Sequence, residues 1–262
     1  MKKVVSQEGL LGMNRKKEIV KLLTNSGAVR VAQLSKIFGV TEETIRRDLE
    51  KLEAEGQLKR VHGGAVPLSE SSIELPFLER TVKNIEQKIK IGQMAANFVN
   101  DRDIIALDSS STCLELAKNI GDKKVSVLTN GFFVVQELGQ KHDVSVLCTG
   151  GYYNADHHAF FGHSAENSIE GLHIGKLFLS CKGFDVNWGI SESHEQQAMF
   201  KRKLLSIAGQ VNLLVDSSKL NVKALIQTAP LEKIHRIITD NGIEDALVKS
   251  IEKQGIEVII SN

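Results

Sequence analysis

Seven short apolar segments in the second part of the chain constrain its fold more than any other feature of the sequence. Each ends in small polar residues, and stretches with helical periodicity separate one from the next. They read IIALDSSST, VSVLTNG, VSVLCTGG, KLFLSCKGFD, VNLLVDSSK, HRIITDNG and EVIIS. Apolar strands that alternate with helices are typical of a mostly parallel sheet covered on both faces. The sequence therefore predicts a large α/β domain.

The carboxyl ends of these predicted strands carry hydroxyl, amide and carboxylate groups, together with glycines and one lysine. Ligands of open α/β sheets bind beyond this edge. A helix is expected to begin near Thr112, and its N-terminus suits a phosphate, to which Lys219 adds a full positive charge. Turn chemistry alone explains any one of these loops, but five of them on successive strands favour a binding site.

We therefore expect this edge to bind an anionic, hydroxylated effector. The predicted effector-binding residues are Asp108, Ser109, Ser110, Ser111, Thr112, Thr129, Asn130, Gly150, Gly151, Lys182, Asp185, Glu195 and Lys219. Glu195 begins an amphipathic helix and is expected to face the pocket. Trp188 is expected to pack rather than to stack on ligand. We interpret the Lys-Arg-Lys run at 201–203 as a solvated face rather than a phosphate clamp.

Helical periodicity predicts three helices in the first 66 residues. The first runs from about 14 to an Asn-Ser-Gly stop at 25–27. The second covers 31–38, and the apolar residues expected to point inward are Val31, Leu34, Ile37 and Phe38. The third begins after the N-cap residue Thr41, runs to about Glu55 and buries Ile45, Leu49 and Leu52. Two short strands at 57–60 and 65–66 follow, which makes a winged helix-turn-helix.

The third helix of such a unit offers its outward face to the major groove of DNA. Arginine forks onto guanine or clamps a phosphate, and threonine reaches a phosphate or a thymine methyl group. The predicted DNA-binding residues are Arg30, Thr41, Glu42, Thr44, Arg46, Arg47, Lys51, Arg60 and His62. An alternative is that Arg46 and Arg47 only pair with glutamates on a solvated helix. The turn, the wing and the basic surroundings favour DNA binding.

Charge is unevenly spread along the chain. Residues 1–66 contain 13 Lys and Arg against 8 Asp and Glu, a net charge of +5. The remainder contains 20 Lys and Arg against 24 Asp and Glu, a net charge of −4. This distribution indicates that the N-terminal part alone meets a polyanion. We expect three parts: a DNA-binding domain at 1–66, a polar linker at 67–83, and an α/β sensing and oligomerisation domain at 84–262.

Other features bound the class of protein. Apolar runs are too short for a membrane span or a signal peptide, so we expect a soluble, cytoplasmic protein without a membrane partner. The three cysteines are far apart, which supports neither a disulfide framework nor a zinc site. The neighbouring His157, His158 and His163 lack a metal-ligand spacing and are expected at the surface or at a pocket lip. No metal or cofactor is expected.

The stretch VAQLSKIFGVTEETIRRDLEKLEAEGQLKRVHGGAV resembles the DNA-binding signature of the DeoR family of bacterial sugar-metabolism regulators. That signature reads L-x-x-x-F-x-V-S-x-x-T-I-R-R-D-L-x-x-L-x-x-x-G-x-L-x-R-x-H-G-G-A. Thr41 replaces the usual serine, and its hydroxyl can still cap the helix. The resemblance implies that Thr44, Arg46 and Arg47 face DNA, while Asp48 is an internal tie.

The chain from about Arg80 onward resembles the effector domain of that family, which is similar to ribose-5-phosphate isomerase. ALDSSST and VDSSK match its phosphate loop and its D-x-S-K motif. The resemblance implies that Ser110, Ser111, Thr112 and Lys219 hold phosphate and that Asp185 holds a hydroxyl group. Lys182 within CKGFD and Val186 directly after it stand where the isomerase has acids. Without a placed base, binding without turnover is favoured.

We interpret the sequence as that of a DNA-binding regulator, a repressor of a carbohydrate operon, controlled by a sugar phosphate. It is expected to be a homo-oligomer, a dimer or a tetramer, because paired readers match paired half-sites on double-stranded operator DNA. Two alternatives remain open: an isomerase with an appended DNA module, and a constitutive architectural protein.

Overall fold

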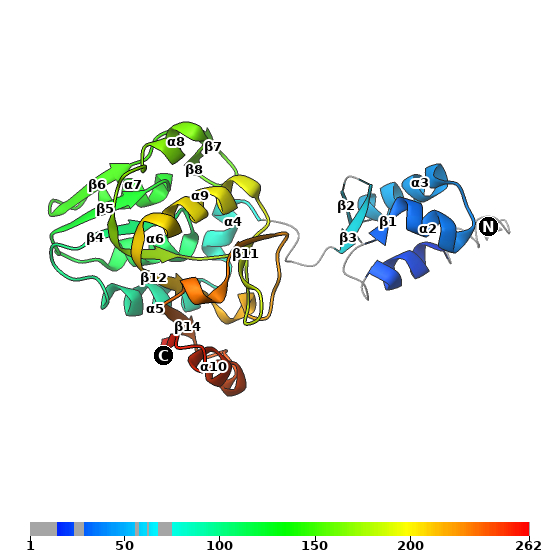
Figure 1. Cartoon of the computed structure of the whole chain (residues 1–262). Coiled ribbons are helices and arrows are strands. Elements are labelled where there is room, and N and C mark those ends of the chain that lie inside the picture. Colours follow the sequence, from blue (N-terminus) through cyan, green and yellow to red (C-terminus); the bar gives the residue numbers. More distant parts are fainter. Residues whose placement is uncertain (1–14, 24–28, 56–57, 62, 68–74, 262) are drawn as a thin grey trace, which may run out of the picture. The chain divides into compact units, whose positions relative to one another are not determined.

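The computed structural model describes residues 15–23, 29–55, 58–61, 63–67 and 75–261 (Figure 1). The chain divides into two compact units, Met1–Ile73 and Glu74–Asn262. No helix among the described residues is long and apolar enough to cross a membrane.

The described part of the first unit contains the expected helices. Residues 15–23 are helical, and α2 (Val31–Phe38) and α3 (Glu42–Ala54) follow. The three strands β1 (Val29–Arg30), β2 (Leu58–Val61) and β3 (Gly64–Pro67) pair antiparallel in the order β1-β3-β2. The wing therefore exists, and β1 is a third strand that the sequence did not predict.

The core of this unit contains the predicted stripe of α3, because Ile45, Leu49 and Leu52 are all buried. One inward assignment is wrong: the side chain of Ile37 is 54% exposed. Helix α2 is short, and Val31 and Leu34 already fill its contact with the core, while Phe38 packs only partly against it.

The second unit is built on one seven-stranded sheet in the order β15-β14-β12-β9-β4-β5-β6, in which every pairing is parallel. The strands coincide with the seven predicted segments, which confirms the expected fold class. They are β4 (Ile104–Leu107), β5 (Val125–Thr129), β6 (Val144–Cys148), β9 (Ile174–Leu179), β12 (Ala208–Leu214), β14 (Arg236–Asp240) and β15 (Glu257–Ser261).

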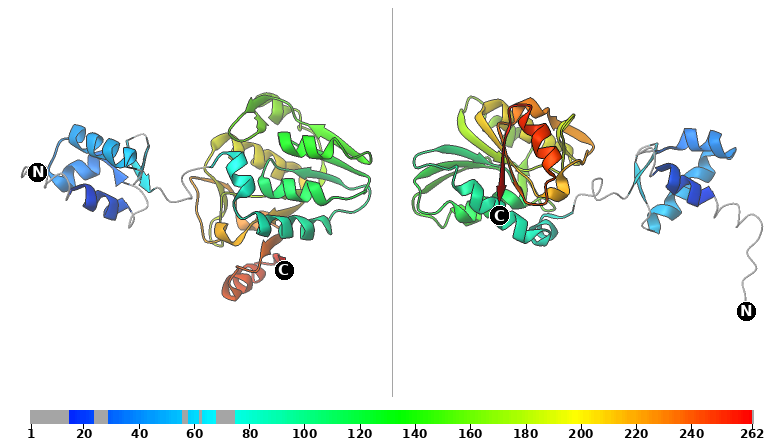
Figure 2. Two further views of the ribbon diagram at one scale, coloured as in Figure 1. Left: turned by 180° about the vertical axis from the view of Figure 1, so that it is seen from behind. Right: turned by 90° about the horizontal axis from the view of Figure 1, so that it is seen from below.

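Helices cover both faces of this sheet, and each face has its own hydrophobic core. On one face lie α5 (Ile85–Ala96), α6 (Ser111–Asn119) and α7 (Phe132–Leu138), seen side by side from behind in Figure 2. The other face is covered by α8 (His163–Asn167), α9 (Glu195–Ile207) and α10 (Asp245–Glu252). Alternate residues of β9 separate the cores: Leu177 and Leu179 join one, and Phe178 joins the other.

Smaller elements at the rim of the sheet were not anticipated. A hairpin joins β7 (Tyr152–Asn154) to β8 (Ala159–Phe161). A separate antiparallel sheet contains β10 (Gly183–Asp185), β11 (Gly189–Glu192) and β13 (Ile226–Ala229). Short 3-10 turns lie at η1 (Ser217–Lys219) and η2 (Leu231–Lys233).

Helix α4 (Phe77–Val82) lies inside the segment expected to be a linker. Phe77 is buried, its ring stacks on Phe133 with centroids 5.2 Å apart, and its amide donates to the carbonyl of Asp156 at 2.7 Å. The sequence did not predict a helix at 77–82 because residues 67–83 are mostly polar and the helix is held by the buried side chain of Phe77.

Candidate functional site

The N-terminus of α3 is capped as the sequence predicted. The hydroxyl of Thr41 accepts a hydrogen bond from the amide of Thr44 at 3.2 Å, which satisfies one of the amides that the helix leaves without a backbone partner. Asp48 is buried and pairs with Arg15 at 2.5 Å. This pair joins α3 to the first helix, so Asp48 does act as an internal tie.

The outward face of α3 carries its arginines as ion pairs with nearby glutamates. Arg46 contacts Glu42 at 2.7 Å, and Arg47 contacts Glu43 at 3.5 Å. Both arginines are exposed. Exposed pairs of this kind contribute only about 0.3–0.5 kcal/mol on a helix, so DNA phosphates can replace the glutamates at little cost.

The other predicted DNA-binding residues lie on the same unit. Arg30 and Lys51 are exposed, Thr44 is half-buried, and Arg60 on β2 pairs with Glu50 at 2.8 Å. His62 lies outside the described residues. Of the predicted basic residues, Arg30, Arg46, Arg47 and Lys51 are therefore exposed, and Arg60 is half-buried.

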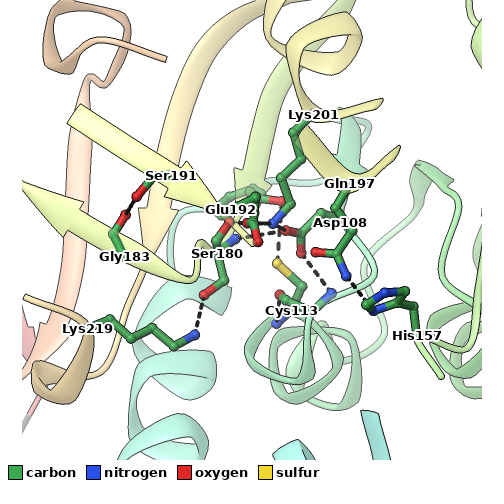
Figure 3. A network of polar contacts seen from close by, with 12 residues as sticks. Asp108, Cys113, His157, Ser180, Gly183, Ser191, Glu192, Gln197, Lys201 and Lys219 are labelled. Carbon is green, nitrogen blue, oxygen red and sulfur yellow. Dashed lines mark hydrogen bonds and ion pairs between the residues drawn. The ribbon is translucent and has the colours of Figure 1, made fainter. Parts of the chain in front are cut away.

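A buried charged network stands at the carboxyl ends of β4 and β9 (Figure 3). Asp108 is 1% exposed and accepts hydrogen bonds from the amides of Ser110 and Ser180, each at 3.0 Å. Its second oxygen also faces the ammonium of Lys201 at 3.1 Å. Lys201 in turn pairs with Glu192, which is buried as well.

The charges of this network hold one another ionised. Burial alone raises the pKa of Asp108, but Lys201 and the hydrogen bonds outweigh it, so the pKa lies below its usual value. Burial alone lowers the pKa of Lys201, but Glu192 and Asp108 outweigh it and raise the pKa above its usual value. Asp108 is therefore ionised, and both of its carboxylate oxygens have partners.

Lys201 corrects the interpretation of residues 201–203 as a solvated face. It is 5% exposed because it lies three residues after Ala198 and three before Leu204, on the inward stripe of α9. The helical spacing was a signal that could have found it. A buried lysine is rare unless it is paired, and here two carboxylates lie within reach.

The loop after Asp108 forms the N-terminus of α6. Ser110 caps this helix, because its hydroxyl accepts from the amide of Cys113 at 3.1 Å. The amides of Ser111 and Thr112 have no partner within the helix, which leaves two donors at its positive end. The hydroxyl of Thr112 is buried and has no hydrogen-bond partner among the described residues.

The neighbouring strand end supplies Thr129 and Asn130, both buried. The hydroxyl of Thr129 accepts from the amide of Gly131, and the side-chain amide of Asn130 donates to the carbonyl of Phe160 at 3.1 Å. The Oδ1 atom of Asn130 has no hydrogen-bond partner within the described part of the chain. A Cβ on Gly131 would lie 3.0 Å from the Cα of Ser109, so this close approach favours glycine.

The turn η1 brings Lys219 to the same network. Its ammonium donates to the hydroxyl of Ser180 at 3.0 Å, and Ser180 also accepts from Lys201 through its carbonyl at 2.8 Å. Two lysines from different elements therefore meet at one serine.

The start of α5 contacts this turn through Asn84, the residue just before the helix. Asn84 donates to Asp216 at 2.9 Å and to the hydroxyl of Ser218 at 3.0 Å. Lys88 is 3% exposed and donates to the carbonyls of Arg80 and Lys83. Burial, and then the charge of Lys219, lower the pKa of Lys88 from 10.5 to about 8.

The remaining predicted effector residues are placed differently from one another. Gly150 and Gly151 follow β6 with φ of 62° and 110°. Lys182 is half-buried beside β10. Asp185 pairs with Lys223 at 3.5 Å and accepts from the amide of Asn187. Glu195 is exposed in the first turn of α9, while Gln197 two residues later is buried. Glu195 therefore does not project into the network.

A small, nearly closed gap lies beside the network. It is lined by Asp108, Ser109, Asn130, Phe161, Gln197, Phe200 and Lys201. Gln197 lies 2.7 Å from His157, and His157 is 5% exposed, which corrects its expected place at the surface or pocket lip. The described residues contain no cluster of three or more His, Cys, Asp and Glu side chains suited to a metal ion.

Comparisons with known proteins agree with both halves of this description. Residues 15–71 match the DeoR-like helix-turn-helix domain, and residues 83–241 match the DeoR C terminal sensor domain. A ribose-5-phosphate isomerase structure in complex with phospho-erythronic acid is similar at a TM-score of 0.39, with 16% identity over 52% of this chain and 54% of that one.

Several curated proteins are similar over nearly the whole chain. The uncharacterized HTH-type transcriptional regulator YulB of Bacillus subtilis is 42% identical over 95% of this chain and 96% of its own length. The L-fucose operon activator of Haemophilus influenzae is 36% identical over 95% and 100%. The putative aga operon transcriptional repressor of Escherichia coli O157:H7 is 31% identical over 94% and 93%.

These relatives are named as transcriptional regulators, which supports the expectation of a regulator rather than an enzyme. The helix-turn-helix and its wing lie within residues 15–71, and the buried network lies within residues 83–241, which are the ranges that the two family models match. This chain belongs to the DeoR family of DNA-binding transcriptional regulators.

Proposed function

We propose that this protein is the sugar-phosphate-controlled repressor of a carbohydrate operon. The observation that carries the proposal is the convergence, at one edge of a parallel sheet, of the α6 N-terminus, the unpartnered hydroxyl of Thr112 and the ammonium of Lys219. Helix amides and a nearby cation are the usual means by which proteins bind phosphate. One relative is named for the L-fucose operon, which supports sugar metabolism as the subject of control.

The second half of the proposal concerns DNA. The helix-turn-helix domain binds double-stranded operator DNA through Arg46, Arg47 and the threonines at the start of α3. Two copies of the chain match two half-sites of the operator. Relatives include both an activator and a repressor by name. We assign repression, with the effector binding one arrangement of the oligomer more tightly than the other. A regulator of this kind works in the cytoplasm, where bacterial DNA lies.

Coupling between the two activities is proposed to pass through Asn84. Its side chain bonds to both Asp216 and Ser218 of the turn that presents Lys219, and it sits at the start of α5, directly after α4. Burial raises the pKa of Asp216, but the charge of Lys219 is the largest of the effects that lower it below its usual value. An anion bound by Lys219 therefore changes the electrostatic environment of Asp216. The segment leading into the sensor domain thus touches the site directly.

The experiment is a thermal-shift screen of the full chain against hexose and pentose phosphates, because a true ligand raises the melting temperature by mass action. Lys219→Ala is expected to abolish that shift and to keep operator binding, while an Arg46→Ala, Arg47→Ala double variant is expected to do the reverse. A chain that binds DNA and responds to no sugar phosphate would contradict the sensing half. Measured isomerase turnover, lost in Asp185→Ala, would favour an enzyme instead.

A further inference from the structure

Strand β6 ends the seven-stranded sheet without the features that usually protect an edge from other chains. It lies at one margin of the second unit, and among the described strands only β5 pairs with it (Figure 1). Natural proteins guard such edges with charged side chains, proline or bulges. The five residues of β6, VSVLC, include no charge and no proline, and their register with β5 contains no bulge. The opposite edge strand, β15, carries Glu257, whose carboxylate pairs with Arg236 at 2.6 Å.

The backbone of β6 presents hydrogen-bonding groups to its open side. The carbonyl of Asp143 and the amide of Thr149, the residues just before and just after β6, both bond to β5. Odd-numbered residues of this segment therefore bond toward β5. Because backbone groups alternate in direction along a strand, the amides and carbonyls of Val146 and Cys148 point away from it. No described strand lies on that side to receive them.

The side chains of β6 are open as well. None of its five residues is buried, although four of them are apolar, and Leu147 is 52% exposed. Val144 and Val146 pack partly against the core that includes α7, so Ser145 and Leu147 face the other side of the sheet. Leu147 pairs in register with Leu128 of β5, which is buried. Burying this exposed apolar strand against a partner is favourable.

The charges beside β6 indicate which partner fits. Lys141 and Asp143 precede the strand, whereas residues 149–153 after it include no Asp, Glu, Lys or Arg. If a second copy pairs antiparallel in a register centred on Val146, Lys141 and Asp143 of each chain lie opposite uncharged residues of the other. A parallel pairing would place each charge opposite its own equivalent, which is destabilising. The antiparallel register centred on Val146 also pairs all five residues of β6.

We infer that β6 is a dimer interface, at which the β6 strands of two copies pair antiparallel about a two-fold axis at Val146. At the axis, Val146 of each copy donates its amide to the carbonyl of the same residue in the other. Each Leu147 lies opposite Ser145 of the second copy. Such an interface is closed and self-complementary. It extends the proposed function, because paired operator half-sites need two copies related by two-fold symmetry.

The test measures the mass of the full chain by sedimentation equilibrium over a series of concentrations. The unmodified chain is expected to form dimers. Val146→Pro removes the amide at the axis and leaves the bonds to β5 in place, since proline is tolerated on the outer side of an edge strand. It is expected to raise the dissociation constant of the dimer at least about tenfold. Val146→Thr has nearly the same shape, keeps the amide, and is the matched control that should dimerise normally.

Two double variants test the register without proline. Ser145→Lys with Leu147→Lys places lysines opposite lysines at the interface and is expected to give monomers. Ser145→Lys with Leu147→Glu places each lysine opposite a glutamate and is expected to keep the dimer. Both positions are exposed, so both double variants should melt within a few degrees of the unmodified chain.

Three results would overturn the inference. They are a chain that stays monomeric at every concentration, a dimer that Val146→Pro leaves unchanged, and a dimer that both double variants weaken equally. A mass that includes a different protein would show that a foreign strand occupies the edge and would overturn it too. A dimer that behaves as expected, in a chain whose melting temperature no sugar phosphate raises, would support the interface and contradict only the proposed function.

Discussion

The two halves of the molecule use the same kinds of charged residue in opposite ways. On α3 the arginines pair with glutamates in solvent, and both partners of the Arg46–Glu42 pair are about half exposed. In the sensor domain Lys201 pairs with Asp108 and Glu192, and all three are almost completely buried. Exposed pairs exchange partners at little cost, whereas a buried pair leaves an uncompensated charge when it is broken. The first arrangement suits reversible DNA binding, and the second suits a fixed frame around a ligand.

The largest effect is expected from removing the buried cation. Lys201→Met leaves Asp108 and Glu192 buried without a positive partner and should lower the free energy of unfolding by about 3–5 kcal/mol. Urea denaturation followed by circular dichroism measures this. Lys203→Met, two residues along the same helix, is the control and should change stability by less than about 0.5 kcal/mol. Similar losses in both variants would contradict the difference between the buried, paired Lys201 and the half-buried Lys203.

The exposed pairs should matter for DNA rather than for stability. Arg46→Ala is expected to weaken operator binding by about 1–3 kcal/mol, which corresponds to roughly 5-fold to 150-fold, if the side chain reaches a base. Fluorescence anisotropy with a duplex selected from a random library provides the measurement. The melting temperature of the protein should stay almost constant. A large loss of stability with intact DNA binding would show that Arg46 is structural.

Lys88 tests a third arrangement, a buried cation held by carbonyl groups. Its pKa is about 8 in the folded chain and 10.5 in the unfolded chain, so the unfolded state binds more protons between these values. Stability should therefore rise with pH from about 8 to about 10.5, by at most about 1.4 kcal/mol per pH unit, and the contribution is absent below that window. Comparing the pH dependence of unfolding with that of Lys88→Met checks it, since the variant should lack this rise.

The smallest effect is expected at Glu43, which contacts both arginines of α3 at the surface. Glu43→Ala should lower stability by only about 0.3–0.5 kcal/mol. It should strengthen DNA binding, because an acid beside the phosphates is removed. The same anisotropy titration at two salt concentrations measures both the affinity and its salt dependence. Weaker binding in this variant would mean that Glu43 positions the arginines.

Local sequence patterns predicted much of the fold. The cap on Thr41, the buried stripe of α3 and all seven parallel strands follow from spacing within a few residues, because backbone bonding and side-chain period are local properties. The position of the loop after β4, which we propose binds phosphate, followed as well, since the carboxyl ends of parallel strands share one edge. The sequence did not reveal the third wing strand or helix α4, whose formation depends on distant partners.

The sequence by itself determined the alternation of apolar and polar residues and the positions of the helix caps. It also determined that a basic DNA-binding domain precedes an α/β sensor domain. Helical spacing indicated that Lys201 lies on the inward stripe of α9, but only the tertiary structure decided that Asp108 and Glu192 are its partners. It also decided that Asn84 meets Asp216 across 132 positions of chain, and that Gln197 meets His157. The physical reason is that a charge or an amide is stable in the interior only when folding brings a complementary group to it.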